Sequence, residues 1–158
     1  MAGLGAACLS GGGMMIYIGF DREEEAELWA RQRINVHATP SFFRAMSAVD
    51  KDGNFICVVV LSNFSSRNID LNIVMEKKKM MPKGVIEMFN EVFSYIFDRL
   101  KAARVTGLLR GTNVAAKRIN ESFGFKLEGI MRKAFEDDDL HIYGFLADDY
   151  RSHAWYRG

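Results

Sequence analysis

The sequence has few of the features that mark several classes of protein. It holds only two cysteines, Cys8 and Cys57, in 158 residues, too few for a disulfide framework, which predicts a reducing, cytoplasmic setting. No apolar run approaches the roughly 18 residues of a membrane-spanning helix, so we expect no membrane partner. Basic residues (21) and acidic residues (20) nearly cancel. The net charge of +1 therefore argues against a nucleic-acid partner.

What is present indicates one globular domain. Hydrophobic residues make up 49% and charged residues 26%, the balance of a chain that buries a core. Residues 1–13 are rich in glycine and alanine, uncharged, and without the basic start of a secretory signal. We expect them to be a flexible leader, the alternative being a buried N-terminal arm. The domain would then span residues 14–158.

Hydrophobic periodicity and turn residues predict the order β-α-β-β-β-α-β-α-β-β. Strands are expected at 14–19, 42–49, 55–61, 68–76, 104–109, 125–132 and 141–146, and helices at 21–34, 82–100 and 112–123, with a last helix as an option at 148–156. Asp21 and Thr112 are the expected N-caps, and Gly124 the expected helix end. The fold class predicted is α/β (α+β), a mixed central sheet of about seven strands with helices on both faces.

The most informative segment covers the last predicted helix and the strand after it. Asn113 and Ala116 are followed by Gly124-Phe125 and then by Glu128-Gly129. With Ile119 and Arg132 these residues stand in a fixed spacing that resembles the GNAT superfamily of N-acetyltransferases. The tail Asp148 to Trp155 resembles most the branch that acetylates protein N-termini and related amines.

The resemblance implies that acetyl-CoA is the co-substrate and an amine the acceptor. It places the CoA pyrophosphate on backbone amides near Lys83, Gly84 and Val85, and the thioester carbonyl on a backbone amide within Val74, Met75 and Glu76. In this family that loop usually holds two small residues, whereas here Pro82 precedes a single glycine. Lys77, Lys78 and Lys79 add positive charge beside it.

The resemblance also implies that residues of the helix at 112–123 bind the co-substrate. Asn113 can bond the pantetheine arm or the splayed strands, and Ala116 leaves room for a ligand. Asn120 stands where the family often has a tyrosine that protonates the thiolate. An amide cannot act as a general acid, so Tyr143 or Tyr17 is the candidate for that role.

The base that deprotonates the amine is sought among three residues. Glu76 is the chosen candidate, since it ends the strand that the resemblance places at the site; Asp70 on the same strand and His141 are the alternatives. No cysteine is well placed as a nucleophile, so we expect direct attack of the amine on the thioester, without a metal.

Other functions remain open at this stage. A GNAT-fold protein that has lost catalysis and serves as a binding or structural component would fit the altered loop and Asn120. Acyl transfer from an aminoacyl-tRNA would need a local basic patch such as Lys77–Lys79 with Lys83. Members of the family often pair through their last strands, so the resemblance implies that this chain forms a homodimer.

Overall fold

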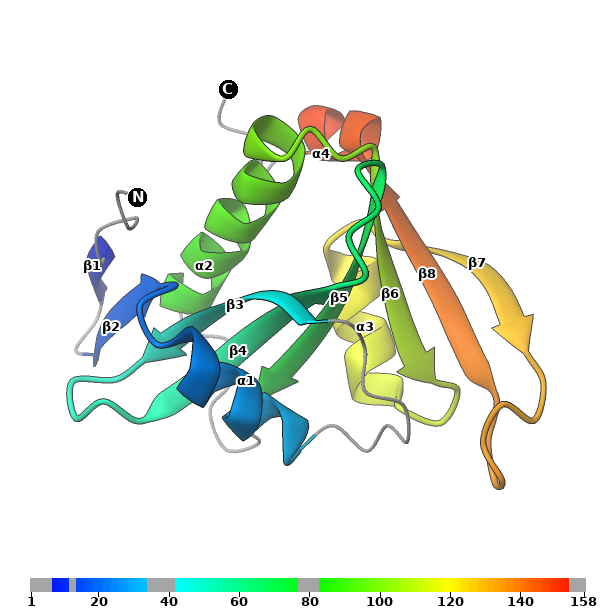
Figure 1. Ribbon diagram of the computed structural model, residues 1–158, viewed down its shortest axis with the longest axis horizontal. Coiled ribbons are helices and arrows are strands. Elements are labelled where there is room, and N and C mark those ends of the chain that lie inside the picture. Colours follow the sequence, from blue (N-terminus) through cyan, green and yellow to red (C-terminus); the bar gives the residue numbers. More distant parts are fainter. Residues whose placement is uncertain (1–6, 12–13, 34–41, 77–82, 154–158) are drawn as a thin grey trace. The chain divides into compact units, whose positions relative to one another are not determined.

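The computed structural model describes residues 7–11, 14–33, 42–76 and 83–153 (Figure 1). The chain divides into two compact units: unit 1 comprises Met1–Asn63 and Asn72–Val92, and unit 2 comprises Phe64–Leu71 and Phe93–Gly158. Strand β5 (Asn68–Met75) supplies its first half to unit 2 and its second half to unit 1. No helix in the described ranges is long and apolar enough to cross a bilayer.

Unit 1 is built on antiparallel strands in chain order. These are β1 (Ala7–Gly11), β2 (Met14–Gly19), β3 (Phe42–Val49) and β4 (Phe55–Ser62). The second half of β5 continues the order, and the Glu76 N–H donates to the Ile56 carbonyl at 2.9 Å. The predicted turn between β3 and β4 is present, with Gly53 at φ +81°, a conformation that favours glycine.

Strand β1 lies in the segment that the sequence suggested was a flexible leader. Cys8 pairs with Tyr17 of β2 in an antiparallel register. Backbone pairing needs no particular side chain, so a stretch rich in glycine and alanine carries little signal for it. Residues 7–11 bring the sheet to eight strands where about seven were expected.

Helix α1 (Glu23–Arg31) covers an apolar patch of unit 1. Ala26 and Ala30 are fully buried against Ala45, Val58 and Val60. The prediction of Asp21 as N-cap is wrong: Arg22 holds that position, without a side-chain capping bond. Three glutamates fill the first turn, as expected, where they interact favourably with the helix dipole.

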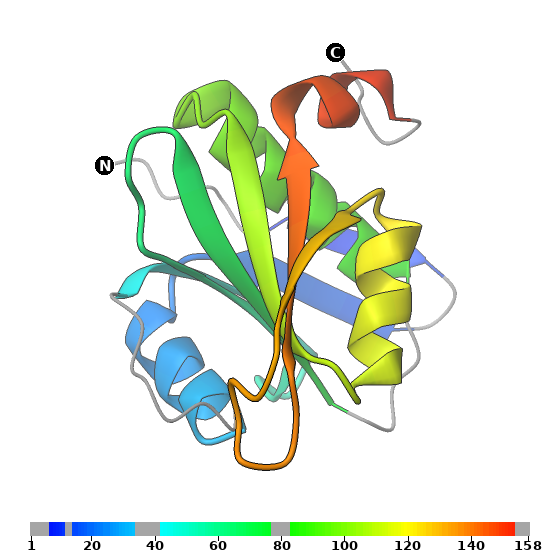
Figure 2. The same cartoon turned by 90° about the vertical axis from the view of Figure 1, so that its right-hand side faces the viewer.

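Unit 2 contains the rest of the sheet. The first half of β5 runs parallel to β6 (Arg104–Arg110), which pairs with β8 (Leu140–Leu146), which pairs with β7 (Lys126–Met131). Helix α3 (Val114–Ser122) lies against β6 and β8, and α4 (Ala147–Ser152) follows β8 at once (Figure 2). Buried aromatic rings fill the core of this unit: Phe93, Phe97, Phe123, Phe125, Phe145 and Tyr150.

The helix predicted over 82–100 is not α-helical throughout. Helix α2 (Lys83–Phe93) gives way to a π-helical segment, η1 (Ser94–Arg99). There the Leu100 N–H donates to the Tyr95 carbonyl at 2.9 Å, the five-residue spacing of a π-turn. An apolar pattern of period near 3.6 does not separate the two kinds of turn.

Candidate active site

The parallel ladder between β5 and β6 is short. It holds four pairs, from Asn68 with Arg104 to Leu71 with Gly107. Strand β6 continues to Arg110 and, within the described part of unit 2, pairs there only with β8. The rest of β5, from Asn72, belongs to unit 1.

The start of α3 is fixed by its own side chains. Asn113 is the N-cap, and its Oδ1 accepts the Ala116 N–H at 3.1 Å. The prediction of Thr112 as cap is wrong, because the Thr112 hydroxyl donates to Asp138 Oδ2 at 2.6 Å instead. That hydrogen bond holds the pKa of Asp138 below its usual range. Asn113 and Ala116 were both expected at a ligand site. In the structure they are joined by the hydrogen bond that caps the helix.

The end of α3 confirms the role expected of Gly124. Its φ is +95°, and its N–H donates to the Glu121 carbonyl while the Phe125 N–H donates to that of Asn120. This pair of bonds is the Schellman motif, which requires the left-handed conformation at the glycine. Asn120 thereby lies in the last turn of a well-closed helix.

Two candidate residues, Asn120 and Tyr143, meet at Gly107. A Cβ on Gly107 would lie 3.1 Å from Asn120 Oδ1 and 3.8 Å from Tyr143 Cβ. Both residues are almost fully buried, and Tyr143 is the β8 partner of Gly107. The absence of a side chain at Gly107 lets the carboxamide approach the strand closely.

The hydroxyl of Tyr143 reaches the outer side of α3. It donates to Glu121 Oε1 at 3.2 Å. Burial and the nearby Glu121 carboxylate raise the pKa of Tyr143, so the phenol is protonated at neutral pH. Tyr143 can act as a proton donor, but its hydrogen is directed at Glu121.

The residues expected around the end of β5 lie in unit 1. Val74 packs against the apolar patch under α1, while Met75 and Glu76 are half-buried. Lys83, Gly84 and Val85 form the first turn of α2, whose N–H groups have no partner within the helix. The lysines at 77–79 and Pro82 lie outside the described residues.

The other candidates have structural contacts of their own. Asp70 Oδ1 accepts a hydrogen bond from Asn68 Nδ2 at 3.0 Å. His141 is half-buried, and its Nδ1 has no hydrogen-bond partner among the described residues. Tyr17 is half-buried in β2, opposite Val49 of β3. Cys57 is fully buried and desolvation raises the pKa of its thiol, which makes it a poor nucleophile.

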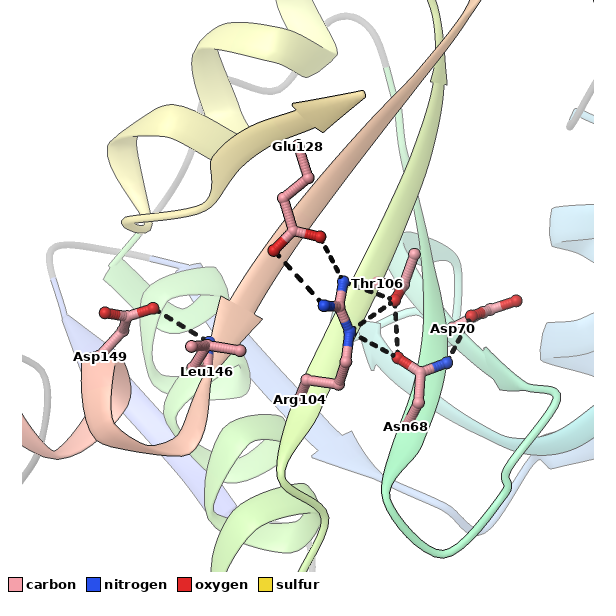
Figure 3. Close-up of polar contacts among 7 residues, drawn as sticks. All are labelled: Asn68, Asp70, Arg104, Thr106, Glu128, Leu146 and Asp149. Carbon is pink, nitrogen blue, oxygen red and sulfur yellow. Dashed lines mark hydrogen bonds and ion pairs between the residues drawn. The ribbon is translucent and has the colours of Figure 1, made fainter. Parts of the chain in front are cut away.

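A polar network ties together β5, β6 and β7 (Figure 3). Arg104 donates from Nη2 to Glu128 Oε2 at 2.7 Å and from Nε to Asn68 Oδ1 at 3.2 Å. The Thr106 hydroxyl donates to the same Asn68 oxygen at 2.6 Å. Glu128 lies directly over Gly144, where a Cβ would overlap its carboxylate. The network links β6, the strand of Gly107, to β5 and β7.

Sequence reasoning did not single out Gly107, Glu121 or Arg104. For Gly107 a signal exists, since a glycine inside an apolar strand marks a close approach by another group. Glu121 and Arg104 carry no such signal in the sequence, because the partner of each comes from a distant segment. Glu121 contacts Tyr143, and Arg104 contacts Glu128.

No family model and no curated protein matches the chain by sequence. Solved structures do match it. A GNAT-family acetyltransferase from Bacillus anthracis shows a TM-score of 0.57 at 17% identity, over 66% of each chain. The ribosomal-protein-S5-alanine acetyltransferase from Vibrio fischeri gives 0.61 at 16% identity, over 80% of this chain and 68% of that one. A variant of the spermidine N-acetyltransferase from Vibrio cholerae gives 0.60 at 20% identity, over 82% and 76%.

The mixed sheet, with its short parallel ladder and flanking helices, defines an α/β fold. More particularly, the chain has the fold of the GNAT acetyltransferases, as the resemblance at Asn113 to Arg132 predicted. The chain covers about two thirds of the first two of these proteins.

Proposed function

We propose that the protein is an N-acetyltransferase that transfers the acetyl group of acetyl-CoA to a primary amine of a protein or small molecule. The observation that carries the proposal is the buried Asn120 carboxamide, which lies against Gly107 of β6 with its Oδ1 unbonded among the described residues. The acetyltransferases that share the fold support the same activity.

Acetyl-CoA would supply the acetyl group as an activated thioester. The first-turn amides of Lys83, Gly84 and Val85 would bind its phosphates, since free N–H groups at a helix start attract anions. Asn113 Oδ1 is already used as the helix cap, so only its Nδ2 group can serve a ligand without opening α3.

The resemblance assigns further residues of each unit to the same co-substrate. Val74 and Met75 would supply backbone contacts to the acyl end, and Ala116 and Asn120 would face the arm. Ala116 suits this position because its small side chain leaves room, and Asn120 because its oxygen has no donor among the described residues.

The reaction needs one proton removed and one delivered. The amine nitrogen forms a bond to the acetyl carbon as the carbon–sulfur bond breaks, Glu76 takes the amine proton, and Tyr143 protonates the departing thiolate. The raised pKa of Tyr143 keeps its proton available at neutral pH. The protonated, buried thiol of Cys57 gives no reason for a covalent enzyme intermediate.

A second function, binding without catalysis, is favoured by one observation. The hydroxyl of Tyr143 is directed at Glu121, and the amide of Asn120 cannot donate a proton to a thiolate. A protein of this kind would bind its ligand and release no product.

Thiol release and product mass distinguish the two functions. Purified protein is incubated with acetyl-CoA and either spermidine or a peptide with N-terminal alanine. We expect one thiol released for each acetylated amine, and no acetyl group on the protein. Glu76→Gln should lower kcat by about 10²–10⁴, while the loop variant Glu136→Gln should leave it unchanged. Bound acetyl-CoA without product from any primary amine would support the binding function instead.

Pairing of two copies and the cytoplasmic location also stay predictions. Strand β7 is the outer strand of the sheet in unit 2, and Leu127, Ile130 and Met131 on it are exposed. An apolar outer strand is a common pairing surface. Light scattering should show a dimer that Ile130→Lys dissociates, and a wild-type monomer would exclude the pairing.

A further inference from the structure

Tyr143 gives its only hydroxyl hydrogen to a residue at the protein surface. Tyr143 itself is 2% exposed, and its hydroxyl donates to Glu121 Oε1 at 3.2 Å. The side chain of Glu121 is exposed on α3, and within the described part of the chain the Tyr143 hydroxyl is its hydrogen-bond partner. A tyrosine has one hydrogen to donate, and an ionised carboxylate can only accept. The contact therefore occupies the one proton that Tyr143 has.

Glu121 occupies an unfavourable position for helix stability. Helix α3 ends one residue after it, at Ser122. A carboxylate in the last turn of a helix is repelled by the negative end of the helix dipole, and glutamate is a weaker helix former than alanine. The stability of α3 therefore does not account for a glutamate here, and its contact with Tyr143 is the interaction that the side chain makes.

Few charged groups surround the Tyr143 hydroxyl. The residues of β6 and β7 that pair opposite Tyr143 are uncharged. On α3, Lys117 and Arg118 stand one turn before Glu121. Among the described residues, Glu121 is the charged group that shifts the pKa of Tyr143, and it raises that pKa together with burial. The titration of Tyr143 therefore reports on its contact with Glu121.

We propose that Glu121 restrains acetyl transfer by holding the Tyr143 proton away from the departing thiolate. The inference rests on the proposed function and concerns the regulation of that site. As the carbon–sulfur bond breaks, its electron pair stays on sulfur. The thiolate takes the hydroxyl proton of Tyr143, and water then returns a proton to the phenolate. The hydroxyl hydrogen must leave the Glu121 carboxylate before this transfer, so Glu121 is a positioning residue that acts through Tyr143.

The test measures the single-turnover rate of thiol release, with the full chain in excess over acetyl-CoA and with saturating spermidine or alanine peptide. Glu121→Ala removes the acceptor and should raise this rate about tenfold, the effect of one net hydrogen bond. Glu121→Gln keeps a neutral, weaker acceptor and should give a smaller rise. The KM for acetyl-CoA should be unchanged in both variants. Glu136→Ala replaces an exposed glutamate of the loop after β7 and is the matched control, which should alter neither quantity.

Two further measurements separate the restraint from a structural effect. In a Tyr143→Phe background, Glu121→Ala should leave the rate unchanged, because no hydroxyl proton remains to be released. With Tyr143 present, Glu121→Ala should lower the pKa of Tyr143, since the carboxylate raises it. The ultraviolet absorbance of the phenolate reports that pKa directly. The fall of the rate at alkaline pH should move to lower pH by the same shift.

The other outcomes distinguish this inference from the proposed function. Acetylation by the wild-type protein, with an unchanged or slower rate in Glu121→Ala, would overturn the inference alone. The same holds if Glu121→Ala raises the rate equally in the Tyr143→Phe background. A wild-type rate in Tyr143→Phe would also remove Tyr143 as the proton donor, but it would leave acetyl transfer standing. No thiol release by the wild-type protein with either amine would overturn the inference and the proposed function together.

Discussion

Replacing Gly144 by alanine tests the arrangement of the strands in unit 2. A Cβ at this position would overlap the Glu128 carboxylate, so the glutamate must turn away and release Arg104. The two side chains are 38% and 31% exposed, and a pair so placed contributes about 0.5–1 kcal/mol. A strained rotamer adds roughly 0.5–1 kcal/mol. The φ of Gly144 is not positive, so alanine itself stabilises by about 0.4–1 kcal/mol through the unfolded chain.

The effect of Gly144→Ala on the free energy of unfolding changes sign when the Glu128 side chain is removed first. In the wild-type background Gly144→Ala should lower the free energy of unfolding by about 0.5 kcal/mol. In the Glu128→Ala background it should raise that free energy by a similar amount, since nothing remains to be displaced. The coupling between the two positions is then about 1 kcal/mol, within the range for residues in contact.

Urea unfolding of the four proteins, followed by circular dichroism, measures this coupling. Added salt should reduce it, because the Arg104–Glu128 pair is partly exposed. Additive effects of the two substitutions, with no coupling, would refute the placement of Glu128 over Gly144 and with it the register of β7 and β8.

Three further outcomes follow from single residues. Gly124→Ala should destabilise the protein by about 1–2 kcal/mol, because its φ of +95° is unfavourable for residues with a Cβ, and an unchanged urea midpoint would contradict the helix end described. The pKa of Asp138 is lowered by its hydrogen bonds from Thr112. The stabilising effect of Asp138 is therefore complete above its ordinary pKa of 3.8 and is lost as the pH falls through the lower folded value. Asp138→Asn should make the free energy of unfolding fall less steeply with acid. In a Cys8→Ser background the buried Cys57, whose thiol pKa is raised, should react with a thiol reagent only after urea is added, and fast reaction of the native protein would be inconsistent with its burial.

Much of the fold follows from local sequence signals. The alternation in β5 and the unbroken apolar run of β4 predicted strands at nearly the observed bounds. Gly53 and Gly124 marked a turn and a helix end because both need a positive φ. These features depend on short-range geometry, which periodicity and glycine report directly.

Features that depend on distant partners could not be predicted in the same way. Thr112 was predicted to cap a helix, but its hydroxyl donates instead to Asp138, which lies in another loop. The π-turn after Phe93 leaves the apolar pattern unchanged. At the candidate site the sequence identified Asn120 as a departure from the resembled family, while its unsatisfied oxygen at Gly107 depends on the packing of α3 on β6.

A calorimetric titration of the purified protein with acetyl-CoA tests the proposed function most directly. We expect saturable binding of one acetyl-CoA per chain, since the backbone N–H groups of the first turn of α2 can bind its phosphates. Absence of binding up to millimolar acetyl-CoA would contradict the assignment of this fold to acetyl transfer.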